Sequence, residues 1–439
     1  MKLFMNFKHI LNSFLLNKNK KLHPMRILLI SDHADPLAEI GSKEAGGQNI
    51  YVFYLAKFLG RLGISVDIFT RWDRKNKKEV VKLNGNLRVI RVKAGPKKYM
   101  PRDSFLKIVD EFANNILKRI EKEKIQYDVI HTNYWYSGII GLKIAKIIKK
   151  PLVHVYHSVG KIRFESLKKF KIQKDDNELF KQRMIAEKEI AQRADRIIAT
   201  SPVEKKIIKK LFDLEEEKIK VITIGVDTKI FRPIVMEKAR RLLKIENGEK
   251  CILYVGRIEW RKGIGTLLFA FRNIVADYPD AKLYVIGGGK SKSVKKLEEA
   301  ESERIKKIAN ELGLENKIIF LGAKKQKNLY KYYSASNVCV VPSYYEPFGI
   351  VPIESMACGT PVVASRTGGL QYSIKDGKTG HLAKPRDYND LAEKIKETLK
   401  NGKNIYRQNC LKRVQNKFVW EKIAKQYQNY FNQLILKTK

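Results

Sequence analysis

Short runs of apolar, often β-branched residues alternate along the chain with longer segments in which apolar residues recur every three or four positions. The run RILLIS at 26–31 is typical of a buried strand, and segment 49–62 carries Val52, Leu55 and Leu59 on one helical face. The same alternation predicts strands at 66–70, 87–92, 127–131, 152–156, 196–200 and 219–224, with helices at 104–122, 138–149, 176–193 and 202–211. The first half of the chain is therefore predicted to form a β/α series.

A second series of the same kind follows. It places strands at 251–255, 282–286, 317–321, 338–342 and 361–364, and helices at 265–278, 302–312, 327–334 and 352–357. Strands that alternate with helices form parallel sheets with right-handed crossovers. The predicted fold class is therefore α/β, with two doubly wound, Rossmann-like domains that face each other across a cleft.

The join between the two series is marked by turn-forming residues, Gly225 and Pro233 among them. We expect a basic N-terminal extension at 1–24, one Rossmann-like domain at 25–225 and a second at 226–418. The last segment, 419–439, is predicted to be a helix that packs back towards the N-terminal domain.

Charge is the unusual feature of the composition. The chain of 439 residues has 88 Lys and Arg against 46 Asp and Glu, a formal net charge of +42. At 44% hydrophobic residues it is too apolar for a disordered basic tail. The excess favours contact with polyanions such as nucleic acid, anionic lipid or phosphorylated substrates, or else reflects a general lysine bias.

Cysteine usage and hydropathy bear on the compartment. The four cysteines form no C-x-x-C pair, so neither a disulfide framework nor a zinc site is indicated, and a cytoplasmic location fits. No apolar run reaches the roughly 18 residues of a membrane span. The extension at 1–24 has lysines and no acidic residue. We expect it to be dispensable; a weak signal peptide and an amphipathic helix on the inner membrane surface are the alternatives.

Three motifs lie just after predicted strands, where open parallel sheets bind ligands. The segment GGQN at 46–49 opens a helix, so its backbone can approach a phosphate. Arg257 and Lys262 follow the strand at 251–255 and suit a diphosphate. The strongest motif is EPFGIVPIE, in which Glu346 lies in a loop and Glu354 in the first turn of a helix that Pro352 begins.

Histidines end two further strands. His131 begins HTNYW, and His157 ends HVYH before Ser158. Histidine at such positions is either a hydrogen-bonded core residue or a functional one. No H-E-x-x-H or Asp-x-Asp pattern accompanies them, so no metal site is expected.

Taken together, these motifs resemble the retaining nucleotide-sugar glycosyltransferases of family 4, which have the GT-B fold. The resemblance runs from Met25 to the end of the chain and is most specific at 346–354. The N-terminal half is most similar to the branch that contains sucrose-phosphate synthases and the N-acetylglucosaminyl-inositol-phosphate synthase of mycothiol synthesis. The motifs that carry this are GGQNIY at 46–51, HTNYW at 131–135, and His157 and Ser158 followed by Arg183 in a helix.

The resemblance implies a role for each residue. The C-terminal domain would bind the nucleotide sugar and the N-terminal domain the acceptor. The donor would be held by Gly47, Arg257, Lys262, Glu346, Phe348, Gly349, Ile350 and Glu354. The catalytic residues would be His157, Glu346, Arg257 and Lys262, and a phosphorylated acceptor would contact Asn49, Arg102, Tyr134, Ser158 and Arg183.

The expected function is therefore transfer of a sugar from a nucleoside diphosphate sugar, a UDP-sugar being favoured, to a hydroxyl of a phosphorylated or sugar-like acceptor. Retention of the α configuration is expected, with the nucleotide sugar as co-substrate and no tightly bound cofactor. One alternative is the same fold acting on a membrane lipid or polysaccharide, which peripheral contact with anionic membrane would help. A more remote one is a non-catalytic basic nucleic-acid-binding protein, but no specific nucleic-acid-binding motif is present.

Overall fold

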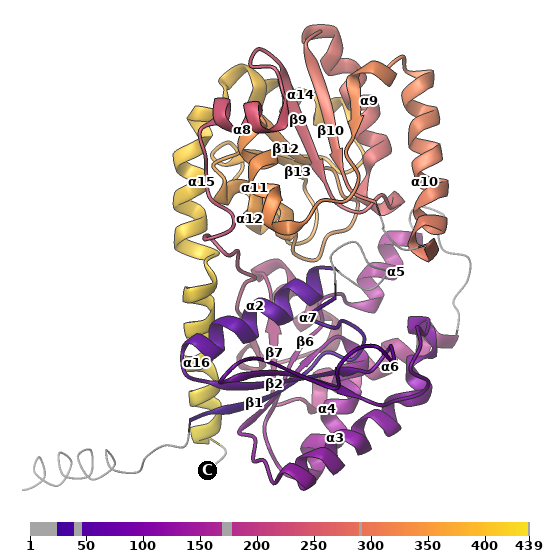
Figure 1. The fold of residues 1–439 in the computed structure, drawn as a ribbon, viewed down its shortest axis with the longest axis vertical. Coiled ribbons are helices and arrows are strands. Elements are labelled where there is room, and N and C mark those ends of the chain that lie inside the picture. The colour runs from indigo at the N-terminus through magenta and orange to yellow at the C-terminus, as the bar shows by residue number, and fades with distance from the viewer. Residues whose placement is uncertain (1–23, 39–45, 169–177, 289–291, 438–439) are drawn as a thin grey trace, which may run out of the picture.

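A computed structural model describes residues 24–38, 46–168, 178–288 and 292–437. The described chain forms two α/β domains, one above the other in Figure 1, which confirms the predicted fold class. The expected N-terminal extension lies outside the described residues except for Pro24.

The N-terminal domain is built on an eight-stranded sheet of order β3-β4-β2-β1-β5-β6-β7-β8. Its strands are β1 Arg26–Ile30, β2 Ser65–Arg71, β3 Val80–Asn84, β4 Leu87–Val92, β5 Val129–Asn133, β6 Leu152–Val155, β7 Arg196–Ala199 and β8 Ile219–Val221. Its helices are α2 Gly47–Arg61, η2 Arg102–Ile108, α3 Val109–Glu123, α4 Trp135–Ile148, α5 Gly160–Lys168, α6 Glu178–Arg193, α7 Pro202–Phe212 and η3 Glu216–Lys218.

The C-terminal domain is built on a six-stranded parallel sheet of order β11-β10-β9-β12-β13-β14. Its strands are β9 Lys250–Val255, β10 Ala281–Ile286, β11 Ile318–Phe320, β12 Val338–Val341, β13 Val362–Ser365 and β14 Gly380–Ala383. Its helices are α8 Met236–Leu243, η4 Trp260–Lys262, α9 Ile264–Asp277, α10 Lys292–Glu311, η5 Glu315–Lys317, α11 Gln326–Ala335, α12 Ile350–Ala357, α13 Leu370–Ser373, α14 Tyr388–Asn401 and α15 Lys403–Lys417, with α16 Trp420–Lys437 as the last helix.

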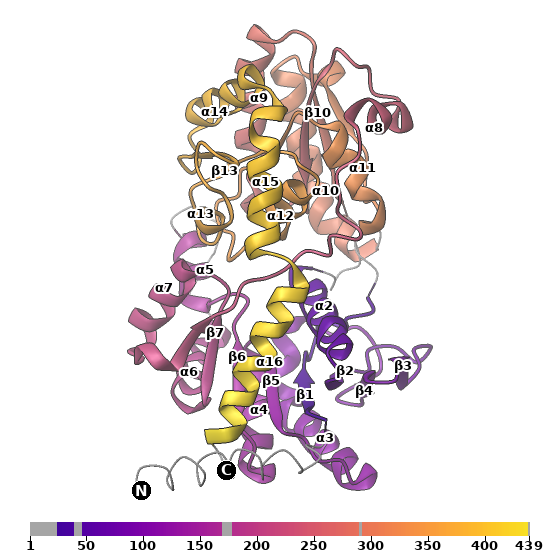
Figure 2. The same cartoon turned by 90° about the vertical axis from the view of Figure 1, so that its left-hand side faces the viewer.

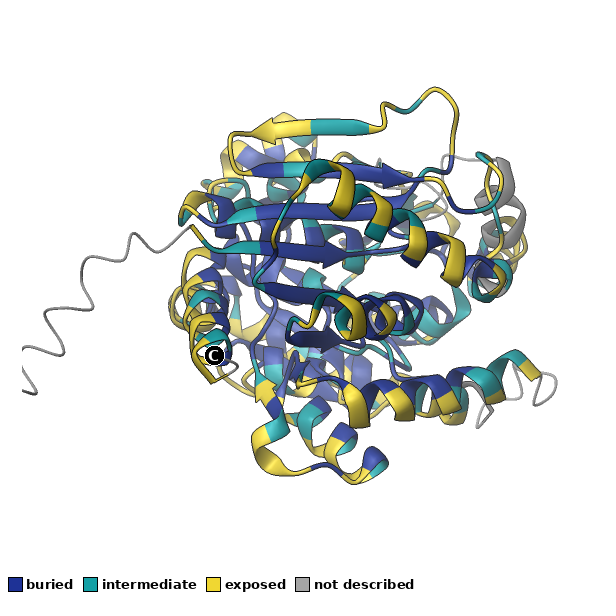
Figure 3. Cartoon of the chain, turned by 90° about the horizontal axis from the view of Figure 1, so that it is seen from below, coloured by how far each residue is buried: buried dark blue, intermediate teal, exposed yellow. Residues whose placement is uncertain are grey.

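Central strands are apolar on both faces because helices cover both sides of each sheet, and Figure 3 shows the strands inside the molecule mostly in the dark blue of buried residues. In β1 the side chains of Ile27, Leu28, Leu29 and Ile30 are all fully buried. Local signals for a helix start are present as well. Helix α7 begins at Pro202, and Ser201 Oγ caps it by accepting a hydrogen bond from the amide of Glu204 at 3.1 Å.

The structure departs from the predicted elements at several points. The edge strand β3 was not predicted, and it pairs antiparallel with β4, so the first sheet is mixed. Its VVKLN sequence is largely exposed and lacks the long apolar run of the central strands. The helix expected at 104–122 begins only at Val109, after the 3-10 segment η2. Strand β14 and helices α8, α14 and α15 were also missed.

The last two helices run along one side of both domains (Figure 2). After α15, the chain crosses back and α16 packs on α2 of the N-terminal domain. Trp420 is fully buried and stacks on Tyr54, with ring centroids 6.2 Å apart. Beside the crossing, the amide of Val226 donates to the carbonyl of Phe418 at 2.7 Å. The two segments that connect the domains, at Val226 and at Phe418, therefore lie side by side.

The cysteines and the apolar helices can also be described. The four cysteines are unpaired and buried. Among the residues that the structure describes, no helix combines the length and apolar character that a membrane crossing requires.

Candidate functional site

A cavity of about 460 Å³ opens between the two domains. Both sheets turn the carboxyl ends of their central strands towards it, as expected for open parallel sheets. It is lined by most of the predicted site residues: Gly47, Asn49, Tyr134, His157, Ser158, Arg257, Lys262, Glu346, Phe348, Gly349, Ile350 and Glu354. Residues as far apart in the sequence as Gly47 and Glu354 thus converge on one volume.

Cations and carboxylates are paired on the C-terminal wall of this cavity. Lys262 Nζ forms an ion pair with Glu346. Arg257 Nη1 lies 3.1 Å from Glu259 Oε1, and Arg261 Nε donates to Glu259 Oε2 at 2.8 Å. Burial acts to raise the pKa of Glu259, but Arg261 and Arg257 outweigh it and lower that pKa to about 2. Glu259 is therefore ionised and holds the two guanidinium groups together.

The segment between Glu346 and Glu354 turns into α12. Gly349 has φ +88°, a left-handed conformation that favours glycine, and is followed by the first residue of the helix, Ile350. The helix thus starts two residues before the predicted Pro352. Its first amides have no helical partner, and they lie at the positive end of the helix dipole on the cavity wall.

Glu354 is nearly fully buried on α12. Gln326 Nε2 donates to its Oε1 at 3.2 Å, and Tyr333 OH donates to its Oε2 at 2.9 Å. Burial raises the pKa of Glu354 to about 7, although both hydrogen bonds act to lower it. The carboxyl group therefore changes its charge near neutral pH while lining the cavity.

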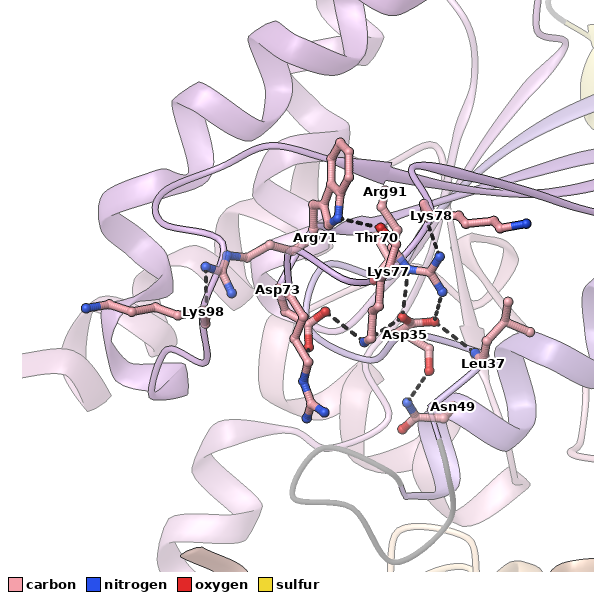
Figure 4. A network of polar contacts seen from close by, with 12 residues as sticks. Asp35, Leu37, Asn49, Thr70, Arg71, Asp73, Lys77, Lys78, Arg91 and Lys98 are labelled. Carbon is pink, nitrogen blue, oxygen red and sulfur yellow. Dashed lines mark hydrogen bonds and ion pairs between the residues drawn. The ribbon is translucent and has the colours of Figure 1, made fainter. Parts of the chain in front are cut away.

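Opposite this wall, the start of α2 is joined to Asp35 by a polar network (Figure 4). The amide of Gly46 donates to Asn49 Oδ1 at 2.9 Å, and Asn49 Nδ2 donates to the carbonyl of Asp35 at 2.8 Å. The carboxylate of Asp35 is in turn paired with Lys77 and Arg91, at 2.9 and 3.0 Å. Asn49, predicted to bind the acceptor, has both side-chain polar atoms engaged with Gly46 and Asp35.

Gly47 faces the C-terminal domain across the cavity. A Cβ atom built at Gly47 would have as its nearest neighbour Ile350 Cδ1, at 3.5 Å, which is an ordinary contact. The backbone of Gly47 does not have a positive φ. Neither strain nor packing within the protein therefore requires a glycine here, whereas close approach of a ligand to the backbone would.

His157 lies where β6 ends, with its backbone at φ +57°. Neighbouring Tyr134 has φ +75°, so two bulky residues adopt strained conformations at the cavity, as is common at functional sites. His157 Nε2 lies 2.8 Å from Asn133 Oδ1. Burial, with smaller contributions from His131 and His33, lowers the pKa of His157 to about 3. The imidazole of His157 is therefore neutral at physiological pH.

The remaining predicted acceptor residues differ in how they are placed. Arg183 does not line the cavity; it lies behind it, with Nε on Glu187 at 2.7 Å and Nη1 on Tyr134 OH at 3.2 Å. Ser158 Oγ is buried beside the cavity, where it lies near the hydroxyl of Tyr345 without well-formed hydrogen-bond geometry to any described residue. Arg102 is in η2, and its side chain lies outside the description.

Several cavity residues were missed by the sequence reasoning. His33 lines the cavity, and its Nδ1 lies 2.9 Å from Asp32 Oδ2. Both directly follow the first strand, a position that could have singled them out. Glu259 and Arg261 lie between two predicted cations in the sequence RIEWRK. In the described part of the chain, no group of three or more His, Cys, Asp or Glu side chains could hold a metal ion.

Two family models match consecutive parts of the chain. A family described as Glycosyltransferase Family 4 matches residues 45–230, and one described as Glycosyl transferases group 1 matches residues 235–417. D-inositol 3-phosphate glycosyltransferase of Corynebacterium aurimucosum is 34% identical over 379 residues, which cover 85% of this chain and 88% of that protein. The chain belongs to glycosyltransferase family 4.

Solved structures agree with this assignment. Sucrose-phosphate synthase from Thermosynechococcus elongatus superposes on this family 4 enzyme with a TM-score of 0.85 and 38% identity, covering 94% of this chain and 100% of that one. The Anabaena protein HepE, in complex with UDP and glucose, shares the fold with a TM-score of 0.70 and 20% identity, covering 93% and 99%. The protein is therefore a glycosyltransferase with the GT-B fold, and the predicted resemblance is confirmed.

Proposed function

We propose that this family 4 enzyme transfers a sugar, with retention of its α configuration, from a nucleoside diphosphate sugar to a hydroxyl of a phosphorylated acceptor. UDP-sugars are the favoured donors. The observation that carries the proposal is the convergence of Arg257, Lys262 and Glu346 on the cavity, opposite the glycine loop at Gly47 and beside His157.

On the donor side, Arg257 and Lys262 would bind the diphosphate. Both are close enough to carboxylates to be held in place before the donor arrives, which limits the reorganisation that binding requires. Glu354 would accept hydrogen bonds from the ribose hydroxyls. Glu346 and the amides that follow Phe348 would bind hydroxyls of the transferred sugar.

Chemically, the leaving diphosphate gains negative charge as the bond to the sugar breaks. Arg257 and Lys262 would stabilise that charge, and they accelerate the step insofar as they bind the departing group more strongly than the substrate. The acceptor hydroxyl would attack from the face that the diphosphate leaves and pass its proton to a phosphate oxygen. His157, being neutral, would serve as a hydrogen-bonding group to the sugar and not as a charged acid.

The acceptor side supports a phosphorylated polyol or sugar. The relatives named above are a D-inositol 3-phosphate glycosyltransferase and a sucrose-phosphate synthase, and both names contain a phosphate ester. In this chain the hydroxyl of Ser158 and the side chains of Tyr134 and Arg163 line the N-terminal part of the cavity. Arg183 would support Tyr134 from behind, Asn49 would hold the start of α2 beside them, and Arg102 would complete the phosphate site.

A matched panel of substrates tests the proposal. Purified enzyme is given UDP-glucose or UDP-N-acetylglucosamine with D-inositol 3-phosphate or fructose 6-phosphate, and each acceptor is paired with its dephosphorylated form. We expect release of UDP with at least one phosphorylated acceptor and much less with its partner. Equal turnover of both forms would contradict a phosphate site, and a β-anomeric product by NMR would contradict retention. Transfer only to lipid in anionic vesicles would favour the membrane acceptor instead.

A further inference from the structure

Arg261 lies between Arg257 and Lys262 in the sequence, and all three line the same cavity. Its side chain lines the cavity between the domains and is about one-third exposed. Its Nε donates a hydrogen bond to Glu259 Oε2 at 2.8 Å. Within the described chain, the two terminal nitrogens of Arg261 donate no hydrogen bond to the protein, and they are not among its buried unpartnered atoms. Four N–H groups are thus available at the cavity.

The charges around Arg261 are arranged for an anion. Lys262 is neutralised by Glu346, whereas Arg257 and Arg261 share the single carboxylate of Glu259. These three cations and two carboxylates all line the same cavity and leave one positive charge uncompensated. Since burial weakens screening by water, this excess acts strongly on a negatively charged ligand.

The backbone fixes the base of the Arg261 side chain. The residue lies in η4, and its carbonyl accepts a hydrogen bond from the amide of Tyr344 at 2.8 Å, which ties η4 to the loop that carries Glu346. Because Glu259 also holds Nε, the Arg261 side chain has little conformational freedom left to lose when its two terminal nitrogens bind a ligand. A planar fork of two terminal nitrogens matches a phosphate group.

We propose that Arg261 is a third ligand of the donor diphosphate, which it contacts through its terminal nitrogens while Glu259 positions it next to Arg257. This inference rests on the proposed function, since it needs a nucleoside diphosphate in the cavity. It assigns Glu259 as a positioning residue, and it explains why one carboxylate lies between two arginines in a site for an anion.

Binding of UDP and of uridine to purified variants, measured by calorimetry or competition, tests the proposal. We expect Arg261→Ala to weaken UDP binding about ten-fold, because it removes a charged hydrogen-bonding group. Uridine binding should stay as in the wild type. Arg261→Lys keeps the charge without the fork and should recover only part of the loss. Arg366→Ala is the matched control, because it removes an arginine paired with Asp376 outside the cavity.

The outcomes distinguish a failure of the Arg261 inference from a failure of the proposed function. If the wild type prefers UDP to uridine and Arg261→Ala keeps that preference in full, the third ligand is disproved and the proposed function stands. If the wild type binds UDP no better than uridine, the proposed function itself fails. A loss of uridine binding equal to the loss of UDP binding would indicate general damage to the domain and would also overturn the inference. Thermal unfolding of each variant without ligand shows whether it is folded.

Discussion

Glu354 offers a test in which stability and function should change in opposite directions. Its carboxyl group is nearly fully buried and, among the residues that the structure describes, receives hydrogen bonds from Gln326 and Tyr333 alone. Burial raises its pKa from 4.5 to about 7. Between these pH values the folded protein keeps a proton that the unfolded chain releases. Stability from this group is therefore complete below pH 4.5 and is lost as the pH rises through 7.

The size of the effect follows from the same shift. At about 1.36 kcal/mol per pH unit, holding an ionised Glu354 in the folded state costs about 3 kcal/mol at pH 8. Glu354→Gln has nearly the same shape but carries no charge, and Tyr333 OH can accept from the new amide as well as donate. We expect Glu354→Gln to be more stable than the wild type at pH 8, by up to about 3 kcal/mol, and of similar stability at pH 4.5.

Binding should respond in the opposite sense. An ionised carboxylate accepts hydrogen bonds from both ribose hydroxyls, so UDP affinity of the wild type should rise between pH 6 and 8, and Glu354→Gln should bind UDP more weakly without that rise. The assays are unfolding in urea at both pH values and calorimetry with UDP. The exposed Glu217, changed to Gln, is the control. A variant that is no more stable at pH 8, or that binds UDP as tightly as the wild type, would refute the reasoning.

Three further predictions follow from the site and the domain crossing. Arg257→Ala and Lys262→Ala should each lower kcat by about 10²–10³, measured as UDP release, with thermal unfolding nearly unchanged; near-normal turnover would exclude them from the diphosphate site. Gly47→Ala should fold normally yet lose donor binding. Gly263→Ala should fail to fold stably, because the new Cβ would lie 2.0 Å from a backbone oxygen and residue 263 has φ +72°. Equal stability of the two variants would contradict this expectation. Trp420→Ala should cost about 3–5 kcal/mol of stability by emptying a fully buried site, seen as a lower unfolding midpoint; an unchanged midpoint would show that α16 is not essential to the N-terminal core.

Most of the central strands and helices could be predicted, because their hydrophobic pattern depends only on being covered by helices on both faces. β1 and β9 differ from the predicted runs by one residue at an end, and α7 begins at its predicted proline. The exposed edge strand β3 could not be predicted, because its pairing with β4 is what makes it a strand. The start of α12 was misplaced, because Gly349 and not Pro352 sets the turn into the helix.

The sequence by itself determined the fold class, the family and the residue types proposed to bind a diphosphate, since each is encoded in local periodicity or in a short motif. Tertiary structure alone decided how those residues are paired. That Glu259 holds two arginines, that Asn49 bonds to Asp35, and that Arg183 lies behind Tyr134 depends on distances between segments that no spacing encodes. The physical reason is that charge, burial and hydrogen bonding act through space, between segments as far apart in the sequence as Val226 and Val419, which pair where the chain crosses between the domains.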